Sequence, residues 1–133
     1  APNIEGPYTV LNNDQPIFQV DGQGEAEDPF LWKDFKGYHA IFKDHVAKYT
    51  GERGGGVMAH STDGVHWTVD KDPKAYSHAV EWEDGKVEMQ GQLERPVLFF
   101  ENGKATHAFF ATMDGPGGFE NATKSWNMVI PLK

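Results

Sequence analysis

Short apolar runs separated by turn residues alternate along this chain, and no long stretch has the apolar spacing of a helix. The Asp-Gly pair at 84–85 and the Asn-Gly pair at 102–103 are typical of tight hairpin turns. The pattern predicts strands over residues 8–11, 15–20, 29–33, 38–42, 57–61, 65–69, 77–82, 86–90, 96–100, 105–113 and 125–131, and a single helical turn over 119–124. The chain is therefore expected to be all-β.

Two of the predicted strands begin with a similar segment. Glu27-Asp28-Pro29 precedes the first, and Glu94-Arg95-Pro96 precedes the second, 67 residues later. Each strand is followed by a second apolar strand, which contains a His-Ala pair at 39–40 and at 107–108, 68 residues apart. The difference predicts one inserted residue in the second hairpin turn, where an insertion leaves the faces of both strands unchanged.

Repeats of about 67 residues, each with about four short antiparallel strands, are typical of the blades of a β-propeller. We therefore expect a partial β-propeller of about two to two and a half blades. Residues 1–26 would be the tail of a preceding blade, 27–93 one complete blade and 94–133 an incomplete last blade. Such an open arrangement exposes apolar sheet faces, so the remaining blades are expected from the same gene product or another chain. An independent small β-sandwich is the alternative fold.

Composition narrows the classes of partner. The 133 residues carry a net charge of −8, which argues against binding nucleic acid or an anionic membrane surface. The chain has no cysteine, so it forms neither disulfides nor thiolate metal sites. No apolar run is long enough to span a membrane, and the amino terminus lacks the pattern of a signal peptide. We expect a secreted or periplasmic location rather than a cytoplasmic one.

Several segments resemble the C-terminal portion of the five-bladed propeller glycoside hydrolases, which comprise glycoside hydrolase family 43 and its relatives. These segments are residues 27–32, 60–67, 94–110 and 126–133. The resemblance implies a glycosidase that acts on a plant or algal polysaccharide or oligosaccharide. It also implies three carboxylates around the propeller axis, of which Asp28 matches the Asp before a proline and Glu94 matches the general-acid Glu two residues before a proline. The third, the catalytic base, would lie in a missing N-terminal part.

Glycosidic cleavage requires a proton on the leaving oxygen and a carboxylate beyond the anomeric carbon. Like-charge repulsion from Asp28, together with desolvation, would raise the pKa of Glu94 and keep it protonated. We therefore predict Glu94 as the general acid and Asp28 as the modulator of its pKa. Without its base, the isolated chain is expected to be inactive.

Four further residues are predicted to contact substrate. Arg95 could bind a hydroxyl pair or a substrate carboxylate, His45 and Arg53 lie in a long loop that could overhang a cleft, and Trp32 could stack on a sugar ring, although its apolar strand favours a core position. No spacing of His, Asp and Glu predicts a metal site or cofactor, but the resemblance allows a structural cation on the propeller axis. The alternative function is a non-catalytic carbohydrate-binding or assembly module.

Overall fold

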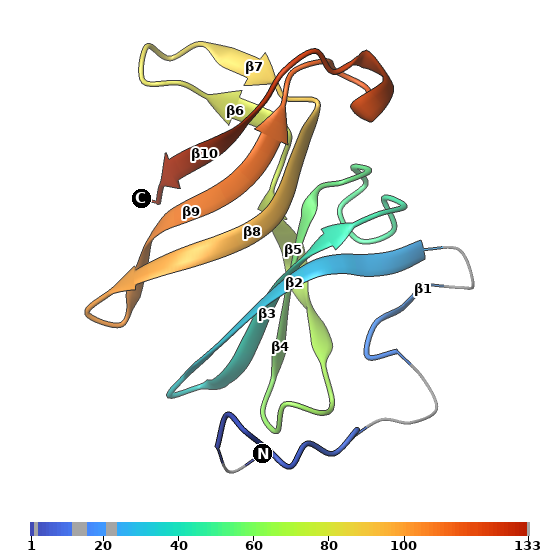
Figure 1. Cartoon of the computed structure of the whole chain (residues 1–133), viewed down its shortest axis with the longest axis vertical. Coiled ribbons are helices and arrows are strands. Elements are labelled where there is room, and N and C mark those ends of the chain that lie inside the picture. Colours follow the sequence, from blue (N-terminus) through green and yellow to red (C-terminus); the bar gives the residue numbers. More distant parts are fainter. Residues whose placement is uncertain (2, 12–15, 21–23, 133) are drawn as a thin grey trace.

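The computed structural model describes residues 1, 3–11, 16–20 and 24–132 and shows an all-β chain with three antiparallel sheets (Figure 1). A five-stranded sheet has the order β1-β2-β3-β4-β5, a three-stranded sheet the order β10-β9-β8, and β6 and β7 form a hairpin. The strands are β1 (Gln19–Val20), β2 (Gly24–Asp34), β3 (Gly37–Asp44), β4 (Gly56–Ser61), β5 (Thr68–Tyr76), β6 (Ala79–Glu81), β7 (Val87–Met89), β8 (Gln92–Glu101), β9 (Lys104–Met113) and β10 (Ser125–Pro131). A short 3-10 helix, η1, spans Phe119–Asn121.

The repeated segments form two hairpins with the same pairing. In β2–β3, Leu31 lies opposite Ala40, and in β8–β9, Leu98 lies opposite Ala108. Both turns contain two residues, so the predicted insertion in the turn is wrong. The extra residue lies within the second hairpin instead, where a β-bulge changes the pairing from Phe99 opposite His107 to Phe100 opposite Ala105.

A second bulge is common to both hairpins and lies at the prolines. The pairing shifts between Glu27 and Phe30 in β2 and between Glu94 and Val97 in β8. The residue before each proline takes a left-handed backbone conformation, with φ of 50° at Asp28 and 55° at Arg95. Non-glycine residues seldom adopt this conformation, and a residue before proline is usually extended. The sequence repeat is therefore also a repeat of backbone strain.

One face of the five-stranded sheet packs against the three-stranded sheet (Figure 1). The rings of Trp32 and Phe100 lie 6.0 Å apart, and Tyr76 meets Phe110 edge-on at 4.8 Å. Phe110 also belongs to a core cluster on this side of the three-stranded sheet, together with Val80, Leu93, Ala108 and Met128. A separate core on the opposite face of the five-stranded sheet contains Phe42, Val57 and Ala59, covered by Phe18, Tyr49, Trp67 and Val69.

The predicted hairpins, the turn at 83–85 and the final strand are confirmed. The strand predicted over 8–11 is wrong, since these residues pair with no neighbour and form no strand. The strand predicted over 15–20 shortens to β1, and residue 15 lies outside the described residues. The strand predicted to start at Val65 begins only at Thr68. The all-β class is confirmed, none of the three sheets closes on itself, and the five-bladed propeller stays a prediction.

No helix in the described part of the chain is both long and apolar enough to cross a membrane.

Candidate functional site

The two sheets meet at a buried lysine that contacts a glutamate from each repeat. The Lys43 ammonium lies at the end of β3, with its side chain 8% exposed. It donates hydrogen bonds to both carboxylate oxygens of Glu94, at 2.8 Å and 3.1 Å, and to Glu27 at 3.3 Å. His45 Nδ1 lies 3.2 Å from the same Glu27 oxygen. One cation is thus shared by the equivalent carboxylates of the two repeats.

The surroundings of Glu27 favour its charged form. Burial alone would raise the pKa of Glu27, but the hydrogen bond and charge of Lys43, with a smaller effect from His45, lower it below the ordinary value. Beside this cluster, Arg95 Nε lies 3.9 Å from Asp28 Oδ1. The two strained residues before proline therefore face one another across the junction of the sheets.

Tyr76 closes the buried side of the same junction. Its ring lies directly on Gly56, where a Cβ atom would approach the ring to 2.1 Å, so only glycine leaves room for it. The hydroxyl is buried and has no hydrogen-bond partner among the described residues. Burial, and then the charges of Glu94 and Asp28, raise the pKa of Tyr76. The phenol therefore stays neutral, close to both predicted catalytic carboxylates.

Glu94 and Arg95 also form one wall of a cleft of about 390 Å³. The remaining walls combine aromatic rings with polar side chains. They are Ala111, Thr112, Met113, Phe119, Ser125, Trp126 and Asn127. Sugar rings present apolar faces and hydroxyl edges, so a cleft with two aromatic rings and several hydrogen-bonding groups suits a carbohydrate.

A well-bonded loop holds the Phe119 ring at the edge of this cleft. The Asp114 carboxylate accepts hydrogen bonds from the backbone N–H groups of Thr123 and Lys124, both at 2.7 Å, and from the Thr123 hydroxyl at 2.6 Å. These bonds lower the pKa of Asp114. The loop between β9 and β10 is thereby closed at its base, and exposed Phe119 projects from η1 within it.

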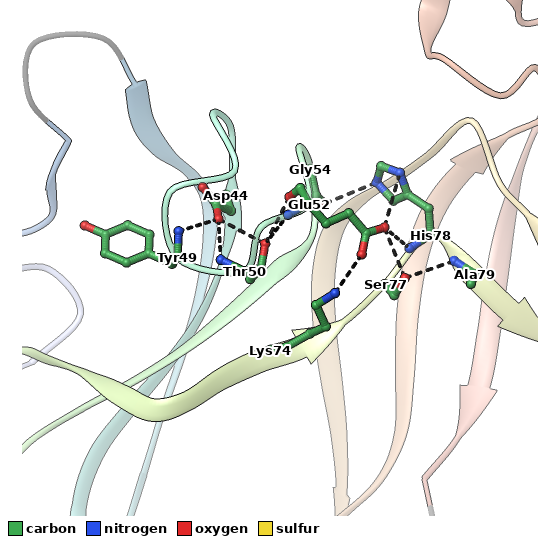
Figure 2. A network of polar contacts seen from close by, with 9 residues as sticks. All are labelled: Asp44, Tyr49, Thr50, Glu52, Gly54, Lys74, Ser77, His78 and Ala79. Atoms are coloured by element: carbon green, nitrogen blue, oxygen red, sulfur yellow. Dashed lines mark hydrogen bonds and ion pairs between the residues drawn. The ribbon is translucent and has the colours of Figure 1, made fainter.

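The long loop after β3 is similarly fixed. Buried Asp44 accepts hydrogen bonds from the backbone of Tyr49 and Thr50, both at 2.8 Å, and from the Thr50 hydroxyl at 3.0 Å (Figure 2). Loops of this length are usually functional or mobile, but this one is anchored at its start. His45, the next residue, is therefore held beside Glu27.

Glu52 anchors the far end of that loop to the segment between β5 and β6 (Figure 2). Its carboxylate accepts hydrogen bonds from the Ser77 hydroxyl at 3.0 Å, the His78 backbone N–H at 2.9 Å and the Lys74 ammonium at 3.2 Å. Burial alone would raise the pKa of Glu52, but these donors lower it. Hydrogen bonds to Asp44 and Glu52 therefore fix this glycine-rich loop at both ends, beside the cluster around Lys43.

The predicted site residues divide into two groups. Glu94, Asp28, Arg95 and His45 come together around Lys43 and the cleft. Trp32 instead packs in the interior between the sheets, stacked on His39 with ring centroids 5.1 Å apart. Arg53 is exposed on the long loop. Their predicted contact with substrate stays a prediction.

Sequence reasoning missed Lys43, Tyr76, Phe119 and Trp126. Glu27 could have been found, because it aligns with Glu94 in the repeat. Lys43 gave a weaker signal, since a lysine at the end of an apolar strand usually reaches solvent. The cleft aromatics come from a separate loop and strand, and no local pattern connects them to Glu94.

Within the described residues, no three His, Asp or Glu side chains form a group that could hold a metal ion. Comparisons of the chain with protein families, with curated proteins and with solved structures found no match.

Proposed function

We propose that this chain forms part of a glycoside hydrolase and binds a carbohydrate in the cleft beside Glu94. The observation that carries the proposal is a carboxylate in the wall of a cleft that also contains two aromatic rings, from Phe119 and Trp126. A ring of the substrate would stack on these side chains, while its hydroxyls bind Ser125 or Asn127. Arg95, at the mouth of the cleft, would bind a further oxygen of the substrate.

In this proposal Glu94 donates the proton to the leaving oxygen, and Asp28 modulates its proton affinity. A protonated Glu94 would no longer neutralise Lys43. The ammonium also contacts Glu27, however, so it keeps a charged partner when Glu94 takes up a proton. Glu27 thus allows the buried lysine to remain beside an acid that changes charge during the reaction. The carboxylate that serves as base is proposed to come from outside these 133 residues.

One observation favours a second candidate, carbohydrate binding without cleavage. Lys43 donates hydrogen bonds to both oxygens of Glu94. This is the arrangement of a permanent ion pair, in which the carboxylate has no proton to donate. In this candidate, the Glu94–Lys43 pair is structural and the cleft alone carries the function. The two candidates agree on the cleft and differ in the role of Glu94.

Binding is tested by titrating the chain with arabino-, xylo- and agaro-oligosaccharides in a calorimeter. Replacing Trp126 by Ala should weaken binding about tenfold, since a lost ring contact costs roughly 1.4 kcal/mol. Trp82 is the matched control, because its side chain is equally exposed, at 37%, but lines a separate cavity beside β10. Absence of binding for every sugar, or equal weakening by Trp82→Ala, would overturn the proposed cleft.

A further inference from the structure

The cleft beside Glu94 contains a cation that is not held by its surroundings. Arg95 lines the cleft, and its side chain is 78% exposed. In its ion pair with Asp28, Nε lies 3.9 Å from Oδ1, which is longer than a hydrogen bond. Within the part of the chain that the structure describes, the guanidinium therefore makes no hydrogen bond, and its N–H groups are available to a ligand.

The other charge in the cleft is already compensated. The side chain of Glu94 is only 13% exposed, and both of its carboxylate oxygens accept a hydrogen bond from the Lys43 ammonium. The remaining residues that line the cleft are uncharged. They are Ala111, Thr112, Met113, Phe119, Ser125, Trp126 and Asn127. A negatively charged ligand would thus meet the Arg95 cation, and no uncompensated carboxylate lines the cleft to repel it.

The fold does not require an arginine at this position. Both repeats have a glutamate, then a residue with left-handed backbone conformation, then a proline, with φ of 50° at Asp28 and 55° at Arg95. Aspartate is one of the few side chains enriched in this conformation, whereas arginine is not. Strained residues of this kind are concentrated at active sites and ligand clamps. The arginine is therefore better explained by what its side chain binds than by the backbone.

An exposed guanidinium selects for a particular kind of ligand group. Its planar fork donates two parallel hydrogen bonds to a carboxylate, a geometry that a single hydroxyl does not match. A neutral sugar presents only hydroxyls, whereas a uronic acid carries a planar carboxylate on its ring. The net charge of −8 repels anions at long range, but at physiological ionic strength this repulsion is screened beyond about 8 Å. The charges in the cleft itself therefore decide which sugars bind.

We propose that the cleft binds an acidic oligosaccharide and that Arg95 pairs with the carboxylate of a uronic acid residue in it. The ring of the sugar stacks on Phe119 or Trp126, and its carboxylate lies against the guanidinium. This inference rests on the proposed carbohydrate cleft and names the class of substrate that it binds. Arg95 determines specificity in this account, whereas the proton transfer is assigned to Glu94.

The test is calorimetric titration of the chain with oligogalacturonates and oligoglucuronates. Each is compared with the same oligosaccharide after its carboxylates have been reduced to alcohols, which removes the charge and keeps the rings and linkages. The wild-type chain should bind one of the acidic sugars at least about tenfold more tightly than its reduced form. Arg95→Gln should bind both forms with the affinity that the wild type has for the reduced form. Circular dichroism establishes that the variant is folded.

Lys104→Gln is the control, because it removes the same charge from an exposed position at the turn end of the β8–β9 hairpin, opposite the end that carries Arg95. It should keep the full preference for the acidic sugar. Equal affinity of the wild type for the acidic and reduced forms overturns this inference and leaves the carbohydrate cleft standing. A preference that persists in Arg95→Gln, or that is lost equally in Lys104→Gln, also overturns it. Binding of neither form would instead count against the cleft itself.

Discussion

Asp28 and Arg95 occupy the same position in two repeated hairpins, and they meet across the junction of two sheets with 3.9 Å between Oδ1 and Nε. Both have left-handed backbone conformations before a proline. Strain of this kind persists only where the surrounding structure imposes it, and it is concentrated at functional sites. Here it bends each strand just after a glutamate, and both glutamates contact Lys43.

The backbone strain at Arg95 predicts that two substitutions differ in their effect on stability. Arg95→Gly should change the free energy of unfolding by less than about 1 kcal/mol, because glycine adopts φ of 55° without strain. Arg95→Val should destabilise the chain by about 1–2 kcal/mol, since a β-branched residue is disfavoured there. Urea denaturation measures both. Exposed Arg53 does not have positive φ, so the same two substitutions there should have similar effects on stability. If Gly and Val differ as much at Arg53 as at Arg95, backbone strain at Arg95 is not the cause of the difference.

Removing the shared cation should destabilise the junction of the sheets. Lys43→Met leaves Glu94 and Glu27 without their common partner, and the expected loss is about 2 kcal/mol in the free energy of unfolding. The loss is smaller than for a fully buried pair, because Glu27 is partly exposed. Lys71→Met, an equal change of charge on an exposed part of β5, should cost little. Equal losses in the two variants would mean that Lys43 does not join the sheets.

Acid should weaken the anchoring of the long loop through Glu52. The pKa of Glu52 is lowered in the folded chain, so its contribution to stability is complete above the ordinary value of 4.5 and is lost as the pH falls through the folded value. The melting temperature should therefore drop below about pH 4.5. Glu52→Gln should be less stable at neutral pH and should show a smaller drop in acid. If the melting temperature of Glu52→Gln falls in acid as much as that of the wild type, protonation of Glu52 is not a cause of the acid sensitivity.

The fold and the site could be predicted from the sequence to different extents. Tight turns such as Asn102-Gly103 are determined by neighbouring residues, and the matching prolines identified the repeat, so both hairpins were predicted. The bulge that holds the extra residue of the second hairpin was not predicted. The strand over residues 8–11 was predicted from its β-forming residues alone, but a strand also requires a partner. Local patterns carry no information about such partners.

The same limit applies to the site. The family resemblance predicted Glu94 and Asp28 as site residues from their place before proline, yet the groups that surround them in the structure lie far away in the chain. Lys43 is 51 residues from Glu94, and Trp126 reaches the cleft from the last strand. Trp32 was predicted to contact a sugar because of its residue type, but in the structure its ring stacks on His39.

The proposed acid is tested most directly by Glu94→Gln in the gene product that contains this chain. If Glu94 donates the proton, hydrolysis of an oligosaccharide should fall by about 10²–10⁴-fold, while binding in the cleft is retained. A dinitrophenyl glycoside should be much less affected, because its leaving group departs without a proton. Glu101→Gln, an exposed carboxylate on the same strand, should leave both rates unchanged. Undiminished hydrolysis of the oligosaccharide by Glu94→Gln would contradict the account.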